Sequence, residues 1–275
     1  MMADKIRLLI ALCLLSGCPG IPAPRSTATV RAGDLPGDVE GLKKYADEQF
    51  MKQEAIAIEN SLVALDKAIG LDGRSEEILW RAARATAWLA DEYRDKSHRA
   101  GFARRGIEYA KRAIDVTDTR VEGHYYYGIN LGLYATTKTI GAHGDVPVVA
   151  KEAEKAMKID EKYEHAGPLR LLGSVYAKAP PWPVSIGDTD EGVKYLKRAV
   201  ELSPEDPQNH LLYGDALAAD KRPKEATREY QIVLAAQPMP EWAHRLERWK
   251  QEADAAIKKL EHKPIDSGAG ATTPF

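Results

Sequence analysis

The stretch Pro207–Pro238, PQNHLLYGDALAADKRPKEATREYQIVLAAQP, decides how the rest of the sequence is interpreted. Within it, Gly214, Ala226, Tyr230 and Pro238 follow one another at intervals of twelve, four and eight residues. Two closely packed antiparallel helices need small residues where their backbones cross and a bulky side chain beside the crossing. Gly214 and Ala226 supply the small pair and Tyr230 the bulky neighbour. The proline then ends the second helix, so the stretch predicts a helical hairpin.

Four earlier segments end in the same way, with a basic residue, an alanine and an aliphatic residue. Their alanines, Ala68, Ala113, Ala156 and Ala199, lie about 45 residues apart. Each ending predicts the second helix of one pair, which makes five hairpins in all. The last helical segment, from Glu241 to about Glu261, is expected to be a single helix with a solvated outer face that caps the stack.

This repeating unit resembles the tetratricopeptide repeat, a helix-turn-helix of about 34 residues. Pro204 to Pro238 spans one such period. The resemblance implies an all-α fold, a right-handed superhelical stack of about five tetratricopeptide-like hairpins plus a C-terminal capping helix. The longer repeats imply insertions in the turns within pairs, and two are visible, at residues 139–144 and 179–183. No strand-like alternation longer than a few residues occurs in the sequence.

The first eighteen residues resemble an export signal. Lys5 and Arg7 precede an apolar run, Leu8–Leu15, that is too short to span a bilayer, which takes about 20 residues. Leu-Ser-Gly-Cys then ends at Cys18 and resembles a bacterial lipobox. An ordinary secretory signal that happens to end in cysteine is the alternative.

The lipobox resemblance implies a domain plan for the whole chain. Residues 1–17 would be removed as a lipoprotein signal peptide, and residues 18–36 would be the lipidated cysteine and a flexible, Pro- and Ala-rich tether. Residues 37–262 would form the tetratricopeptide-like α-helical domain, and residues 263–275 a disordered tail. The protein would be lipid-anchored to the bacterial cell envelope.

The cysteines and the residue after the anchor sharpen this expectation. Pro19 in place of an acidic residue favours the outer membrane, with the protein facing the periplasm. Cys13 would leave with the signal peptide and Cys18 would carry lipid. The mature chain would then have no thiol for a disulfide, a metal or catalysis, because the sequence contains two cysteines.

Composition and motifs argue against an enzyme and against a nucleic-acid partner. The 275 residues include 39 basic and 41 acidic side chains spread along the chain, with a net charge of −2. Phosphate binding needs a basic face, and no long Lys/Arg run exists. No HExxH, GxSxG or phosphate-binding loop is present. His124, His143 and His165 match no metal-ligand spacing, so we expect surface or capping histidines, no metal and no cofactor.

The first helix of each pair is expected to line a concave face that binds a partner or a small ligand. The repeat register turns Arg81, Trp88, Tyr125, Arg170 and Lys178 towards this face. Arg170, Ser174 and Lys178 are spaced by four and therefore share one side of a helix. The two cations could hold a carboxylate, with the arginine in bidentate fashion, or they could be ordinary solvated charges.

Two further segments stand out. In HYYYGINLGLYA, residues 124–135, three successive tyrosines point about 100° apart and cannot serve one face. Tyr127 is interpreted as helix packing, and the glycines at 128 and 132 as a close helix approach or as room beside a ligand. In Pro180-Pro181-Trp182-Pro183, Trp182 either plugs the helix ends or contacts a partner protein.

Taken together, the lipobox, HYYYGINLGLYA and LRLLGSVYAKAPPWPVSIGDTDEGVKYLKRAVELSPEDPQNHLLYGDAL, residues 169–217, resemble the T-component family of TRAP transporters. The resemblance covers roughly residues 40–240. It implies a periplasmic lipoprotein that binds a solute-binding protein, and a small organic-acid or hydrophobic ligand in a central pore, and it allows for a homo-oligomer. The alternative is a general protein–protein interaction scaffold of the cell envelope.

Overall fold

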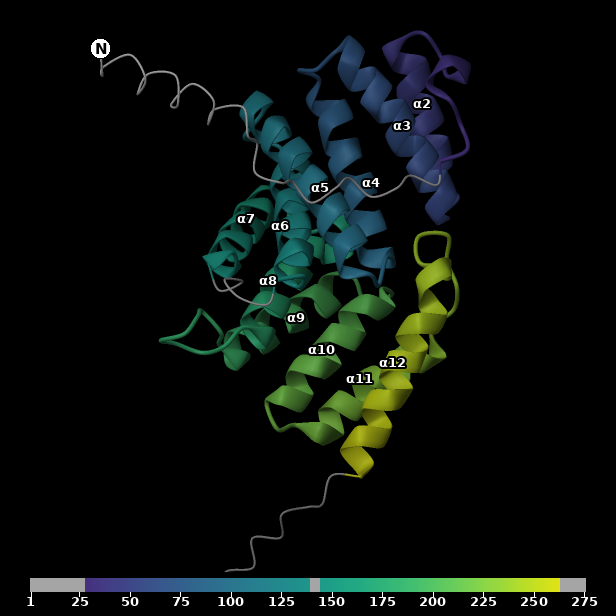
Figure 1. Ribbon diagram of the computed structural model, residues 1–275. Helices are drawn as coiled ribbons and strands as arrows, with labels where there is room; N and C mark the ends of the chain where they lie inside the picture. The colour runs from purple at the N-terminus through teal and green to yellow at the C-terminus, as the bar shows by residue number, and fades with distance from the viewer. Residues whose placement is uncertain (1–27, 139–143, 263–275) are drawn as a thin grey trace, which may run out of the picture.

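The computed structural model describes residues 28–138 and 144–262, and every helix or strand element in those ranges is helical. A 3-10 helix, η1 (Ala32–Asp34), precedes five antiparallel helix pairs that stack in chain order (Figure 1). They are α2 (Val39–Phe50) with α3 (Ala55–Leu71), α4 (Glu76–Glu92) with α5 (Lys96–Val116), α6 (Val121–Ala135) with α7 (Val146–Ile159), α8 (Tyr163–Lys178) with α9 (Thr189–Leu202), and α10 (Pro207–Ala219) with α11 (Pro223–Ala235). A final helix, α12 (Ala243–Glu261), follows them. The predicted stack of five hairpins and one capping helix is confirmed.

Small residues set the helix crossings as the sequence pattern predicts. The four repeated alanines, Ala68, Ala113, Ala156 and Ala199, are fully buried. At Gly214, an added Cβ would lie 2.6 Å from the Tyr230 ring. The glycine and the tyrosine therefore form the close contact between α10 and α11 that the spacing indicates.

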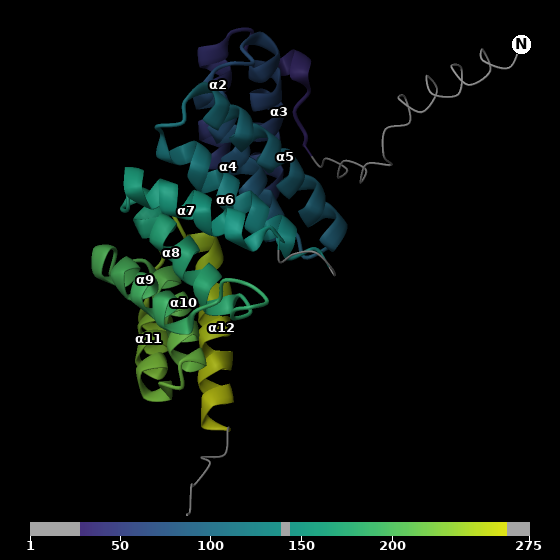
Figure 2. The same cartoon turned by 90° about the vertical axis from the view of Figure 1, so that its left-hand side faces the viewer.

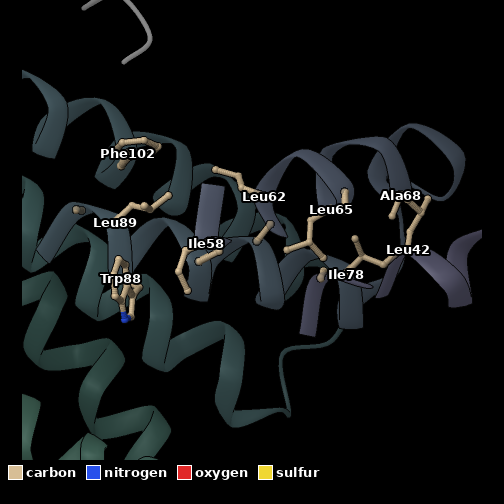
Figure 3. Packing of buried hydrophobic residues seen from close by; sticks show 14 of the residues in the cluster. Leu42, Ile58, Leu62, Leu65, Ala68, Ile78, Trp88, Leu89 and Phe102 are labelled. Atoms are coloured by element: carbon tan, nitrogen blue, oxygen red, sulfur yellow. The ribbon is translucent and has the colours of Figure 1, made fainter. Parts of the chain in front are cut away.

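The first two hairpins share one large hydrophobic cluster, which Figure 3 shows from close by. Leu42, Ile58, Leu65 and Ile78 are each at most 1% exposed there, and Phe102 joins them from α5. Burying a side chain of this size contributes about 1.5–3 kcal/mol. The cluster anchors the N-terminal end of the stack.

Residues 28–36, expected to belong to the tether, lie against α3 instead. The backbone N–H groups of Thr29 and Val30 donate to Asn60 Oδ1 at 2.8 and 3.2 Å. Leu35 is buried, and Lys67 Nζ donates to its carbonyl oxygen at 3.1 Å. The composition of the segment did not reveal this packing, because the contacts are made mainly by backbone groups. The signal peptide, Cys18 and the C-terminal tail fall outside the described residues.

The C-terminal helix closes the arc of hairpins as well as capping it. Leu246, Trp249 and Ala253 are buried in the cluster formed with α10 and α11. The beginning of α12 also reaches α4, where Arg248 Nη2 donates to Asp91 Oδ2 at 3.0 Å across 157 residues of sequence. Figure 2 shows α12 running along the lower hairpins towards the middle of the stack. Among the described helices, none is both long and apolar enough to cross a membrane.

Candidate ligand-binding cavity

A cavity of about 390 Å³ lies on the concave side of the stack. Its wall combines the end of α2 with residues of α4, α6, α8 and the beginning of α10, and the beginning of α12 lies on its remaining side. Six aromatic side chains line it: Phe50, Trp88, Tyr125, Tyr126, Trp242 and Trp249. Cavities of about 300–1,000 Å³ with apolar walls and a few polar groups are typical of small-ligand sites.

Trp88 is held on the cavity wall by groups from both ends of the chain. Its Nε1–H donates to Gln53 Oε1 at 2.8 Å. The ring of His244 stacks on it at 5.4 Å, and the guanidinium carbon of Arg245 lies 5.7 Å from its centroid. Partial burial of the imidazole, together with Arg245 and Arg248, lowers the pKa of His244 to about 4, so this ring is neutral at neutral pH.

The tyrosines of α6 form the second aromatic wall. Tyr125 and Tyr126 make an edge contact at 5.1 Å, and Tyr163 packs edge-on against both. Tyr126 Oη donates to Glu164 Oε1 at 2.8 Å, and burial raises its pKa well above the usual range. Tyr125 faces the cavity as predicted. Tyr127 packs in the hydrophobic cluster of α4–α6, as its interpretation as a packing residue predicts.

An unusual turn at the beginning of α8 completes this wall. Glu164, His165 and Ala166 have φ values of 47°, 54° and 63°, a left-handed conformation that costs about 1–2 kcal/mol per non-glycine residue. Asn209 Nδ2 donates to the carbonyl of His165 at 3.0 Å, and Arg170 donates to the carbonyls of Glu164 and His165 at 3.1 and 3.2 Å. These buried donors offset the strain of the turn.

Arg170 reaches the cavity, but its guanidinium is already occupied. It donates to Asp206 Oδ2 at 3.0 Å and to Asn209 Oδ1 at 2.9 Å, besides the two carbonyls of the left-handed turn. The expectation that it offers a carboxylate-binding cation is therefore corrected, because its own chain supplies every acceptor. The sequence register placed the side chain on the right face and could not reveal its partners.

Three other predicted site residues do not join the cavity wall. Arg81 pairs with Asp47 at 3.0 Å and stacks on Trp80. Lys178 is 60% exposed, and its nearest carboxylate, Asp215, is 3.9 Å away. Trp182 is the third residue that does not line the cavity. The predicted convergence of Arg81, Trp88, Tyr125, Arg170 and Lys178 on one site is thus reduced to Trp88, Tyr125 and Arg170.

Trp182 lies at the tip of an exposed loop. It is 85% exposed and its neighbour Val184 is 59% exposed. The base of the loop is fixed by Gly187 N–H donating to the Pro180 carbonyl and Asp188 N–H donating to the Tyr176 carbonyl, both at 2.9 Å. The interpretation of Trp182 as a packed plug is therefore wrong, and a partner contact stays a prediction.

Of the three histidines considered from the sequence, His124 and His165 lie within the described residues. His124 is 1% exposed rather than on the surface; its Nδ1 lies 2.6 Å from Glu152 Oε2 and its Nε2 lies 2.9 Å from the Asp118 carbonyl. His165 borders the cavity, and His143 lies outside the described ranges. No group of three or more His, Cys, Asp or Glu side chains within the described residues could hold a metal ion.

Residues from α12 and the turn before it are the part of the site that sequence reasoning missed. Trp242, His244, Arg245 and Trp249 line the cavity, and the last three also border a second, more polar cavity of about 560 Å³. The sequence predicts this helix as a cap with a solvated outer face and gives no role to its inner face. The apolar and aromatic side chains in its first half are the signal that could have indicated a second packing partner.

Comparison with known proteins identifies two regions. Residues 42–173 match the family model described as "Regulator of microtubule dynamics protein 1-3", and residues 186–248 match a tetratricopeptide-repeat model. The residues between the two regions, 174–185, include Trp182. Regulator of microtubule dynamics protein 3 of Rattus norvegicus is 23% identical over 64% of this chain. The match spans less than a third of the length of that relative, 28%.

Solved structures share the fold. A thermophilic TPR protein of Thermus thermophilus is 16% identical and superimposes with a TM-score of 0.62, over 80% of this chain and 99% of that one. A tetratricopeptide repeat protein of Parabacteroides merdae is 13% identical, with a TM-score of 0.50 over 83% of this chain and 80% of that one. The hairpin stack and these likenesses show that the chain has the tetratricopeptide-like helical repeat fold.

Proposed function

We propose that this protein is a helical-repeat binding protein that takes a small organic ligand into the cavity on its concave side. The observation that carries the proposal is that the beginning of α12 lies against the concave side and narrows it to a partly open cavity. In an open repeat stack the concave face is a groove that suits an extended peptide. Here Trp242, His244 and Arg245 stand across the groove, which leaves an aromatic-lined cavity of ligand size.

Filling the cavity tests this function. The neutral fluorophore N-phenyl-1-naphthylamine is an apolar aromatic probe whose emission rises in an apolar site. We expect it to bind the native protein, and Ile129→Trp, which places a larger ring in the cavity wall, to weaken binding about tenfold. The readout is a fluorescence titration, with circular dichroism to verify that the variant is folded.

Ile232→Trp is the matched control, because Ile232 lies on α11 and is 44% exposed outside the cavity. It should bind the probe like the native protein. Absence of binding to the native protein, or equal affinities for Ile129→Trp and Ile232→Trp, would refute the proposed ligand site. That result would favour the alternative, a scaffold that uses its outer surfaces, such as the exposed loop with Trp182 and Val184, to bind partner proteins.

The accessory role in a TRAP transporter, with a periplasmic solute-binding protein as partner, stays a prediction from the family resemblance. An internal ligand cavity is consistent with the TRAP accessory role. The matching family models describe a regulator of microtubule dynamics and a tetratricopeptide repeat instead. A homo-oligomer likewise stays a prediction. The curated relatives named for microtubule dynamics are longer chains, and the match covers 28% of the rat protein.

The lipid anchor belongs to the same proposal. Cys18 would be acylated in a bacterial host and hold the protein at the cell envelope, at the outer membrane facing the periplasm. We expect the full chain to incorporate an azido fatty acid during growth and Cys18→Ala to incorporate none. Cys13→Ala is the control, since it alters the other cysteine and should keep the label. Labelling of Cys18→Ala would rule this anchor out.

A further inference from the structure

The charge of Arg245 is less well compensated than that of the other arginines on the cavity wall. Its closest carboxylate contact is 3.5 Å, from Nη2 to Asp91 Oδ2, and its guanidinium makes no hydrogen bond with any described residue. Burial outweighs the attraction of Asp91 and lowers the pKa of Arg245. An arginine stays charged at any physiological pH, so this cation needs an anion that its surroundings supply only in part.

The other two cavity arginines are engaged. Arg170 donates to Asp206, Asn209 and two backbone carbonyls. Arg84 Nη2 donates to Asp47 at 2.9 Å, and its guanidinium lies 3.9 Å from the centroid of the Phe50 ring. Arg84 also keeps a buried Nε without a partner, but its hydrogen bond to Asp47 compensates its charge. Arg245 is therefore the cavity arginine that makes no hydrogen bond with a described residue.

One carboxylate serves two arginines at this end of the cavity. Asp91 accepts from Arg248 Nη2 at 3.0 Å, the shorter of its two contacts, so the hydrogen bond goes to Arg248 and Arg245 is left at longer range. Of the other carboxylates near the cavity, Glu241 lines the wall and Glu92 attracts Arg245 at longer range, and two are paired with other residues. Asp206 pairs with Arg170 and Glu164 accepts from Tyr126, and His244 is neutral at neutral pH.

We propose that Arg245 is the anion-recognition residue of the cavity, so that the ligand carries a carboxylate or sulfonate group on an aromatic or apolar body. This inference rests on the proposed function, because it concerns the same cavity. The guanidinium lies near Trp88, so a ligand whose anionic group pairs with Arg245 can place its body against the aromatic wall. The ligand's anion would give Arg245 a second negative charge besides Asp91, with charge-assisted hydrogen bonds.

Two fluorescent probes that differ by one group test this. 8-Anilinonaphthalene-1-sulfonate has the ring system of N-phenyl-1-naphthylamine plus a sulfonate. We expect Arg245→Gln to weaken binding of the sulfonate probe about tenfold and to leave binding of the neutral probe within about twofold. The readout is a fluorescence titration of both probes against the full chain, with Ile129→Trp weakening both.

Arg248→Gln is the matched control. Arg248 lies on α12 and also pairs with Asp91, but it borders only the second cavity and not the ligand cavity. It should leave both affinities near those of the native protein. Two results would overturn the role of Arg245 and leave the cavity function standing, provided that the neutral probe binds. One is a sulfonate-probe affinity that Arg245→Gln does not change, and the other is an equal loss of that affinity in Arg248→Gln. Failure of the native protein to bind either probe would overturn both.

Discussion

Replacing Arg170 with alanine is expected to lower the free energy of unfolding by about 3–5 kcal/mol. Asp206, its ion-pair partner, is 4% exposed, so the substitution leaves a buried carboxylate without its cation. It also removes the donor to the carbonyls of Glu164 and His165, which lie in the left-handed turn. Urea unfolding followed by circular dichroism measures the change.

A surface arginine in the neighbouring helix provides the comparison for this substitution. Arg198 on α9 also forms an ion pair, with Glu161 at 3.0 Å, but its side chain is 48% exposed. Exposed ion pairs of this kind contribute little, because water screens them. Arg198→Ala should therefore keep the unfolding midpoint of the native protein. Equal midpoints for Arg170→Ala and the native protein would show that the Asp206 pair does not stabilise the fold.

The helical pairs could be predicted from sequence because each pair is a local event. The small residue at a crossing and its bulky partner, such as Gly214 and Tyr230, lie within one repeat, and the repeated alanines mark the second helix of each pair. The same register placed Trp88 and Tyr125 on the concave face, because the first helix of a hairpin presents a fixed side inward.

The side-chain pairings in the cavity wall depend on long-range contacts that no local sequence pattern encodes. Arg245 and Asp91 meet across more than half of the chain, and this depends on how far the stack curves. Two acceptors of Arg170, Asn209 and Asp206, come from the next hairpin. The helical period therefore predicted the face on which Arg170 lies but not the residues with which it pairs. The left-handed turn at Glu164 contains no glycine to mark it.

The exposure of Trp182 has a similar physical origin. An indole in a stiff Pro-rich loop is equally consistent with a plug and with a free tip as far as the sequence goes. Its position follows from where the base of the loop is fixed, at Gly187 and Asp188, by backbone hydrogen bonds to Pro180 and Tyr176. Backbone pairing of this kind leaves no hydrophobic signature in the sequence.

Replacing Gly106 with alanine is expected to lower the free energy of unfolding by about 2–4 kcal/mol. A Cβ at this position would overlap Asn130 Oδ1 and lie 2.5 Å from Thr86 Oγ1, where α4, α5 and α6 meet. Asn130 is fully buried, and its Nδ2 donates to the carbonyls of Ala83 and Tyr126 at 3.0 and 2.8 Å. Moving it aside would break hydrogen bonds that no water can replace, and chemical unfolding measures the loss.

The sign of this effect is informative because helix propensity acts in the opposite direction. Alanine is favoured over glycine inside a helix by about 1 kcal/mol, so a destabilised Gly106→Ala must reflect the steric overlap. Gly70→Ala is the matched variant, since Gly70 lies in α3 with no heavy atom within 4 Å of the added Cβ. It should stabilise the protein or leave it unchanged. If both alanine variants gained stability alike, the close contact of α5 with Asn130 would be disproved, and with it the packing that holds Tyr126 and the cavity wall in place.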